Sequence, residues 1–297
     1  MGNTGPAELL AIWEAGLAHH GPGRALLLHR AARPETAADE LLALPVGERE
    51  ADLYALRRAL FGERMQIRAE CGACGEAMEF DLDARDLGVR PGEQDGPLRV
   101  EEGEWAVELR LPTVADVEAA AQAAAEAGGP LGANGNLDAA SDSYGNVDAV
   151  SDAYGSLGAA SDSCGGEAEQ EPAAARARRA LLARCIVSVH RSGRPMTADR
   201  LPAAELPEPV QRRLAEAAER ADPAADVTLN VACPECGEAT RAELDIASYL
   251  WAELDHWARD LLLDVHLLAT AYGWSEPQIL ALSPLRRRYY LELCADG

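Results

Sequence analysis

Residues 71–83 read CGACGEAMEFDLD, and residues 233–245 read CPECGEATRAELD. Both stretches contain Cys-x-x-Cys followed by Gly-Glu-Ala, and both end in Leu-Asp at the same offset. A short alternating run precedes each stretch, at residues 65–69 and 227–231. Because two thiolates on a tight turn can reach the same metal ion, each stretch has the form of a zinc knuckle set between two strands.

Each knuckle supplies two sulfur ligands, whereas a structural zinc site needs four. Neither copy has a further His or Cys close by. We therefore expect one structural Zn²⁺ held by all four knuckle thiolates, those of Cys71, Cys74, Cys233 and Cys236. Two alternatives remain open: a redox pair, which would stand at a helix N-terminus rather than before a strand-like run, and a metal-free pair. A closed site of four thiolates favours architecture over catalysis.

The composition limits the partners that the chain can have. Its 297 residues contain 50 acidic and 27 basic side chains, and the formal net charge is −23. A chain this acidic is a poor candidate for binding nucleic acid or an anionic membrane through general electrostatics. No basic segment followed by an apolar core opens the sequence, so we expect a cytoplasmic protein whose Cys164, Cys185 and Cys294 are reduced thiols.

Hydrophobic spacing and turn residues divide the chain into four parts. Residues 1–62 form an N-terminal helical segment, and residues 63–127 contain the first knuckle hairpin, a second hairpin and a helix. Residues 128–171 are an insertion, and residues 172–297 contain helices, the second knuckle hairpin and a C-terminal helical region. Helices are expected at 7–18, 25–32, 47–61, 114–127, 172–189, 209–221, 246–272 and 285–293, with a capping box formed by Ser275 and Gln278.

The predicted fold class is therefore α+β. A mostly helical body carries a small zinc-ribbon-like β module made of the two Cys-x-x-Cys hairpins. The insertion is expected to be disordered, because Gly135–Cys164 is three tandem decapeptides and residues 122–171 contain nine acidic side chains and no basic one. A calcium-binding β-roll is the alternative, but such repeats have about nine residues and a glycine-rich pattern that is missing here.

No catalytic constellation stands out. The sequence contains no Gly-x-Ser-x-Gly, phosphate-loop or dinucleotide fingerprint, and we expect a protein that is not an enzyme and has no catalytic residues. Aromatic residues and arginines gather instead near the C-terminus. These residue types are enriched at interface centres, and they predict a partner surface that draws on Trp251, Trp257, Tyr272, Trp274, Tyr289 and Tyr290, although Trp257 also fits a helix core.

Several C-terminal segments carry a resemblance to a known family. They are 250–254 (LWAEL), 262–269 (LLDVHLLA), 271–276 (AYGWSE), 279–283 (ILALS) and 286–292 (RRRYYLE), together with LRLPT at 109–113 and Asp116. Over residues 65–120 and 172–294 the chain resembles the T-even phage baseplate hub assembly chaperone family, whose members with paired knuckles occur in contractile phage tails and bacterial contractile injection systems.

The resemblance implies a non-enzymatic protein that helps to build the baseplate or hub of a contractile particle. Its partners would be baseplate, hub or spike proteins, with neither nucleic acid nor a membrane involved. The alternative is a zinc-ribbon regulator or adaptor that binds nucleic acid or a polymerase. Such a protein needs a basic face around the ribbon, whereas the residues near the knuckles include Glu70, Glu76, Glu79, Asp81, Glu235 and Glu238.

Overall fold

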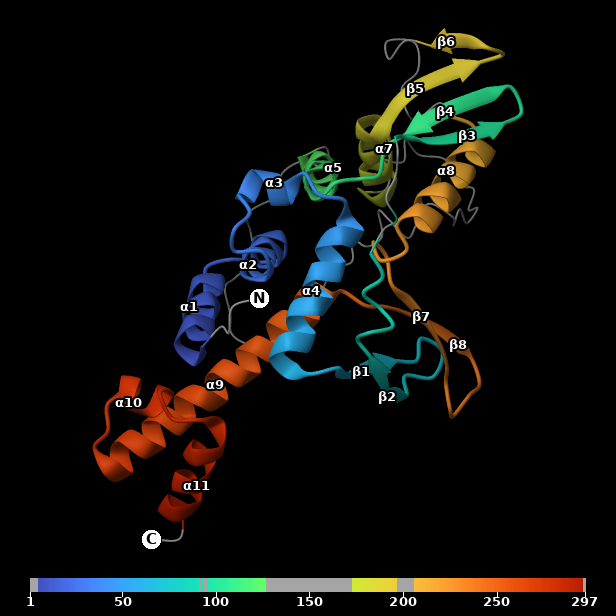
Figure 1. The fold of residues 1–297 in the computed structure, drawn as a ribbon. Helices are drawn as coiled ribbons and strands as arrows, with labels where there is room; N and C mark the ends of the chain where they lie inside the picture. The colour runs from blue at the N-terminus through green and yellow to red at the C-terminus, as the bar shows by residue number, and fades with distance from the viewer. Residues whose placement is uncertain (1–4, 91, 93–95, 127–172, 197–205, 296–297) are drawn as a thin grey trace, which may run out of the picture. The chain divides into compact units, whose positions relative to one another are not determined.

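The computed structural model describes residues 5–90, 92, 96–126, 173–196 and 206–295. The chain forms two compact units, shown in Figure 1. A helical unit combines the two ends of the chain, residues 1–34 and 246–297, and a mixed unit contains residues 35–245. The predicted combination of helices with small antiparallel sheets is confirmed. The predicted disordered insertion at 128–171 lies outside the described residues.

The helical unit contains α1 (Pro6–Leu17), α2 (Pro22–Ala32), α9 (Ile246–Tyr272), α10 (Glu276–Leu280) and α11 (Pro284–Ala295). The long helix α9 buries side chains spaced three, four or seven residues apart, including Leu250, Leu254, Leu261 and Leu268, so one face of this helix lines the core. Its bounds match the expected helix at 246–272. The predicted capping box is also confirmed, since the Ser275 amide donates to Gln278 Oε1 at 2.9 Å.

Trp251 ties α9 to the two N-terminal helices within the helical unit. The Arg24 guanidinium lies 4.4 Å from the centre of the Trp251 ring. A Cβ atom at Gly16 would come within 2.2 Å of that ring, so this contact requires glycine. Trp13 donates its indole N–H to Asp255 at 2.8 Å. Trp251 is therefore a core residue of this unit, and its predicted place in a partner surface is wrong.

The mixed unit begins with α3 (Ala38–Leu42) and α4 (Val46–Phe61), and its described residues form three antiparallel sheets. The first sheet pairs β1 (Arg64–Glu70) with β2 (Ala77–Asp83), and the last pairs β7 (Thr228–Ala232) with β8 (Ala239–Glu243). Between them in the sequence lies a four-stranded sheet of order β3-β4-β5-β6, with bounds Leu98–Glu102, Trp105–Leu109, Ile186–Arg191 and Arg194–Met196. Three further helices are α5 (Val114–Glu126), α7 (Ala173–Cys185) and α8 (Glu208–Ala221).

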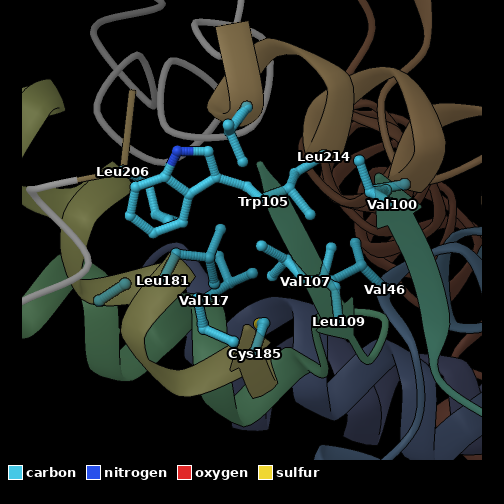
Figure 2. Close-up of a cluster of buried hydrophobic side chains, with 14 residues drawn as sticks. Val46, Val100, Trp105, Val107, Leu109, Val117, Leu181, Cys185, Leu206 and Leu214 are labelled. Atoms are coloured by element: carbon cyan, nitrogen blue, oxygen red, sulfur yellow. The ribbon is translucent and has the colours of Figure 1, made fainter. Parts of the chain in front are cut away.

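The main core of the mixed unit lies on one face of the four-stranded sheet, as Figure 2 shows. In β4, Trp105, Val107 and Leu109 are buried while Ala106 and Glu108 are partly exposed, which is the period of two expected for a half-buried strand. Val107 pairs with Val100 in β3 and with Val189 in β5. Leu181 from α7 and Leu214 from α8 belong to the same buried cluster.

The predicted helix was expected to continue to Val189, but residues 186–189 belong to a strand. Helix α7 ends at Cys185, and the chain continues directly as strand β5. Ile186, Val187 and Val189 are β-branched, which favours extended backbone, and Val187 is exposed while Val189 is buried. Residues 186–189 are too few to distinguish the hydrophobic period of a helix from that of a strand. Their pairing with β4 favours the strand.

The two helices on either side of the predicted insertion are tied to each other. Helices α5 and α7 pack against each other, and Ala124 and Ala177 form a small buried cluster between them. Arg176 donates from Nε and Nη2 to the Ala124 carbonyl oxygen at 3.2 and 2.9 Å. This carbonyl belongs to the last turn of α5, so the start of one helix caps the end of the other.

We expect deletion of Gly128–Gly166 to leave the melting temperature nearly unchanged. The contacts between α5 and α7 do not involve the deleted residues, and a Gly-, Ser- and Asp-rich tract has little apolar surface to bury. Differential scanning calorimetry of the deleted and intact chains measures the difference. A loss of several degrees would mean that the tract docks onto the folded part. Arg176→Ala, which removes the tie between the helices, serves as the destabilised comparison.

Candidate metal centre

The first knuckle is a tight turn at the end of a regular hairpin. Strands β1 and β2 pair down to Glu70 opposite Ala77, and the next residue, Cys71, begins the turn. The Cys71 amide donates to the Glu76 carbonyl at 2.9 Å, and the Gly75 amide donates to the Cys71 carbonyl at 2.8 Å. Gly75 has φ +73°, a left-handed conformation that glycine adopts without strain. The turn therefore requires the glycine that follows the second cysteine.

The second knuckle has the same backbone geometry. The Cys233 amide donates to the Glu238 carbonyl at 2.9 Å, the Gly237 amide donates to the Cys233 carbonyl at 2.9 Å, and Gly237 has φ +75°. The repeated sequence thus produces a repeated structure, with two cysteines on each turn.

The four cysteines come together although they belong to hairpins far apart in the sequence. All four Sγ atoms lie within 4.8 Å of one another. Cys71 Sγ is 3.6 Å from Cys236 Sγ, and Cys74 Sγ is 3.7 Å from Cys233 Sγ. A tetrahedral zinc site with Zn–S bonds of about 2.3 Å has S–S edges of about 3.8 Å. The clustering of the four sulfur atoms is therefore compatible with a metal site, and its spacing fits the tetrahedral geometry of zinc.

Each hairpin contributes one buried and one exposed cysteine. Cys71 and Cys233 are 1% and 2% exposed, and they form a small apolar cluster with Met78. Cys74 and Cys236 are exposed. The inner half of the cluster is therefore part of a small core, whereas the outer half faces solvent.

The electrostatics of the cluster resist full deprotonation without a cation. The amides of Cys74 and Ala73 donate to the Cys71 sulfur and lower the pKa of that thiol to about 6. The Glu76 amide acts in the same direction on Cys74, but the neighbouring thiols of Cys236 and Cys71 outweigh it and raise the pKa of Cys74 to about 12. Because like charges this close disfavour each other, four thiolates require a bound cation.

The surface around the first hairpin carries balanced charge rather than a basic face. Arg64 pairs with Asp81 at 2.6 Å, and Arg68 pairs with Glu79 at 2.9 Å, all on exposed positions of β1 and β2. Arginines neutralised by neighbouring carboxylates are poor contacts for phosphate groups. This arrangement does not favour the alternative of a zinc ribbon that binds nucleic acid.

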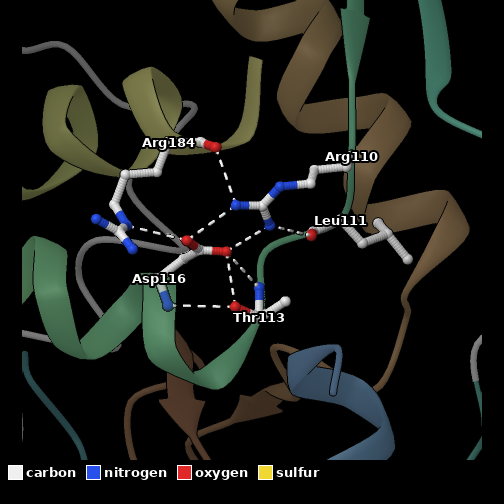
Figure 3. Close-up of polar contacts among 5 residues, drawn as sticks. All are labelled: Arg110, Leu111, Thr113, Asp116 and Arg184. Carbon is white, nitrogen blue, oxygen red and sulfur yellow. Dashed lines mark hydrogen bonds and ion pairs between the residues drawn. The ribbon is translucent and has the colours of Figure 1, made fainter. Parts of the chain in front are cut away.

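Asp116 is a buried carboxylate near the four-stranded sheet, and the sequence predicted only part of its role. Asp116 and Thr113 were expected at the start of a helix, and Figure 3 shows that Asp116 also joins two arginines from other elements. Its carboxylate accepts hydrogen bonds from Arg110 Nη2 at 3.0 Å, from Arg184 Nε at 2.9 Å and from the Thr113 amide at 3.0 Å. Arg110 Nη2 also donates to the Arg184 carbonyl at 3.0 Å.

This network fixes the end of β4, the start of α5 and the end of α7 relative to one another. Burial alone would raise the pKa of Asp116, but hydrogen bonds from Arg110 and Thr113 outweigh burial and hold the pKa well below its usual range. Thr113 and Asp116 are visible in the sequence as a helix start, but the spacing of Arg110 and Arg184, 74 residues apart, gives no local indication that they meet.

The aromatic residues of the predicted partner surface differ in their surroundings: three pack against one another, and Tyr289 is exposed. Tyr272 stacks on Trp274 with ring centres 4.6 Å apart, and Tyr290 packs edge-on against both rings. These three rings join the end of α9 to α11, and each of them packs against the other two. Tyr289 instead points outward, 60% exposed, between Leu285 and Leu293, which are 64% and 63% exposed.

The structure thus presents a protein of mixed helical and antiparallel architecture with four clustered cysteines. In the described residues, no helix is long and apolar enough to cross a membrane. The family model described as "T4 bacteriophage base plate protein" matches residues 30–249, and the chain belongs to this family. The match includes both knuckles, whereas all the C-terminal segments that carry the resemblance, from residue 250 onward, lie beyond it. Searches of curated proteins and of solved structures found no match.

We expect Asp116→Asn to lower the free energy of unfolding at pH 7 by about 1–3 kcal/mol, because it weakens hydrogen bonds to a buried charge and leaves arginine donors without their carboxylate. Since the folded-state pKa of Asp116 is depressed, its contribution is fully present above the unfolded pKa near 3.9 and is lost as the pH falls further. Urea titrations at pH 7 and pH 3 measure both effects.

The matched control is Asp81→Asn, which breaks an exposed ion pair on β2. We expect it to leave the urea midpoint close to that of the wild type. An Asp116→Asn variant as stable as this control at pH 7 would contradict the structural role of the network.

Proposed function

We propose that this protein is a non-enzymatic assembly protein for the baseplate of a contractile, phage-tail-like injection system, and that it acts in the cytoplasm with one structural zinc ion. Membership of the baseplate protein family is the observation that carries the proposal. The family concerns a structural part of a particle, and the cysteine cluster favours the same kind of role. Four thiolates complete a tetrahedral zinc site and leave no ligand position for a substrate.

Zinc would supply stability that the two knuckle hairpins lack by themselves. Each hairpin is a separate two-stranded sheet, and such sheets are marginally stable by themselves in water. The buried cluster beneath the cysteines is small, formed by Cys71, Met78 and Cys233 with Ala69 and Val231 packed against it. Because the ligands come from both hairpins, the free energy of metal binding would stabilise their contact.

We expect purified protein to contain about one zinc per chain, as the shared tetrahedral site requires. Cys71→Ser and Cys233→Ser, one in each hairpin, should each lower the zinc content and the melting temperature, since three remaining thiolates leave the site incomplete. Atomic absorption and calorimetry measure the two quantities. Cys294→Ser, outside the cluster, is the matched control. A zinc content of two per chain, or of zero, would contradict a shared site.

The partner surface is proposed on α11. Leu285, Tyr289 and Leu293 follow one another at intervals of four residues and form one exposed stripe, which we call the α11 stripe. The opposite side of α11 is fixed to α9, because buried Arg287 donates to Asp264 at 3.2 Å. A contiguous apolar stripe on an anchored helix suits docking onto another subunit. The partner would be a baseplate, hub or spike protein.

The decisive experiment removes the gene from its host. We expect complete sheathed particles to be lost or strongly reduced in electron micrographs, while sheath and tube subunits are still synthesised. Wild-type protein supplied in trans should restore the particles. A chain with Tyr289→Ser should restore them poorly, because it places a polar group in the centre of the α11 stripe.

The control for that variant is Val187→Ser, which changes an equally exposed apolar side chain on β5. Both variants should fold, as judged by circular dichroism and zinc content. Normal particle numbers in the deletion strain would overturn the assembly role and favour a zinc-ribbon regulator instead. Full restoration by Tyr289→Ser would retain the assembly role but remove the α11 stripe from it.

A further inference from the structure

Two close sulfur contacts in the cysteine cluster cross from one hairpin to the other. The 3.6 Å contact joins Cys71 to Cys236, and the 3.7 Å contact joins Cys74 to Cys233. Each of these pairs combines a buried cysteine of one hairpin with an exposed cysteine of the other. An oxidant arriving from solvent therefore meets Cys74 or Cys236 first, and the sulfur in contact with it belongs to the opposite hairpin.

We propose that the cluster is also a redox site, in which hydrogen peroxide converts the four thiols into two disulfides between the hairpins, Cys71–Cys236 and Cys74–Cys233. This inference extends the zinc site proposed above. The two disulfides would keep the knuckles joined after their thiolate ligands have been lost. The site would then maintain one architecture in two chemical states, metal-bound when reduced and covalent when oxidised.

The chemistry proceeds in two steps at each pair. The thiolate of Cys236 attacks one oxygen of the peroxide, the O–O bond breaks, and the sulfur is oxidised to a sulfenic acid while hydroxide leaves and is protonated to water. The Cys71 thiolate then attacks the sulfenyl sulfur, the S–S bond forms, and the sulfenic oxygen leaves as hydroxide, which becomes a second water by taking up the proton that Cys71 released on ionising. Two thiols and one peroxide thus give one disulfide and two waters.

The other pair, Cys74 with Cys233, follows the same course and consumes a second peroxide. Complete oxidation therefore requires two peroxide molecules per chain. Since a disulfide offers no thiolate, the oxidised cluster no longer has the ligands of a zinc site.

Contacts across the hairpins favour this pairing over disulfides inside each Cys-x-x-Cys turn. Cys71 Sγ lies 3.6 Å from Cys236 Sγ and Cys74 Sγ lies 3.7 Å from Cys233 Sγ, so each exposed sulfur already contacts a buried sulfur of the opposite hairpin. Met78 packs with Cys71 and Cys233 and covers the inner side of both pairs. The resolving sulfur is in place before the oxidant arrives, and proximity of this kind raises the rate of the second step.

The test uses purified full-length protein loaded with zinc and carrying Cys164→Ser and Cys294→Ser, which removes two thiols outside the cluster. Hydrogen peroxide is added in steps, and zinc release is followed with a chelating dye. Disulfides are mapped by mass spectrometry of non-reduced peptides after alkylation of free thiols. We expect two peroxides to release one zinc, and Cys71–Cys236 and Cys74–Cys233 to be the main disulfides.

Thermal unfolding tests whether the two hairpins stay joined after oxidation. The oxidised chain should retain a single transition close to that of the zinc-bound chain, whereas the reduced chain stripped of zinc by a chelator should melt at a lower temperature. A map dominated by Cys71–Cys74 and Cys233–Cys236, or by sulfinic acids without disulfides, would overturn the proposal.

The disulfide map reports on the thiols alone, so it gives a result whether or not zinc is bound. A chain that lacks zinc but forms the two disulfides between hairpins would contradict the zinc proposal and support this one. Double substitution of Cys74 and Cys233 with Ser leaves Cys71 and Cys236, which should still form a disulfide. Double substitution of Cys233 and Cys236 leaves the Cys-x-x-Cys of the first hairpin and should form one more slowly.

Discussion

The fold of the mixed unit depends on a contact between two cysteine pairs that lie far apart in the sequence. Cys74 and Cys233 are separated by 159 positions in the sequence but by 3.7 Å between their sulfur atoms. The four-stranded sheet and the helices α5, α7 and α8 all lie between them in the sequence. Joining the two knuckles therefore closes a long loop of chain, and the contacts of the folded state must offset the entropy that this closure costs.

A second set of constraints acts at the ends of helices. Asp116 holds Arg110 and Arg184, and Asp222 accepts a hydrogen bond from the Gly47 amide at 2.9 Å in the first turn of α4. In each case a carboxylate at or beside a helix terminus is buried and makes contact with a distant segment. These polar contacts specify which helix end meets which strand, while the apolar cluster in Figure 2 supplies most of the buried area.

Features encoded within a few neighbouring residues were predicted well from sequence. The knuckle turns, the capping box at Ser275 and the bounds of α9 all depend on local spacing, and the structure reproduces them. The strand at Ile186–Arg191 was missed because its hydrophobic period is ambiguous until β4 pairs with it. Tyr272 is 38% exposed, in keeping with its assignment to a surface, but the packing of Tyr272 and Trp274 against Tyr290 is a tertiary contact that local spacing does not reveal. The meeting of the four cysteines could be predicted only because the motif is duplicated and zinc needs four ligands.

The tie between Ala124 and Arg176 has a consequence for how this gene can change over time. Arg176 Nη2 lies 2.9 Å from the Ala124 carbonyl oxygen, and this contact is made by the two helices without a contribution from the repeats encoded between them. Tandem decapeptides are the kind of sequence in which copies are gained or lost during replication, and each doubling of a flexible loop costs only about 0.6 kcal/mol. Related chains could therefore differ by whole repeats at this point while sharing the same sheet, helices and knuckles. The helix pair would act as a fixed frame around a segment of variable length.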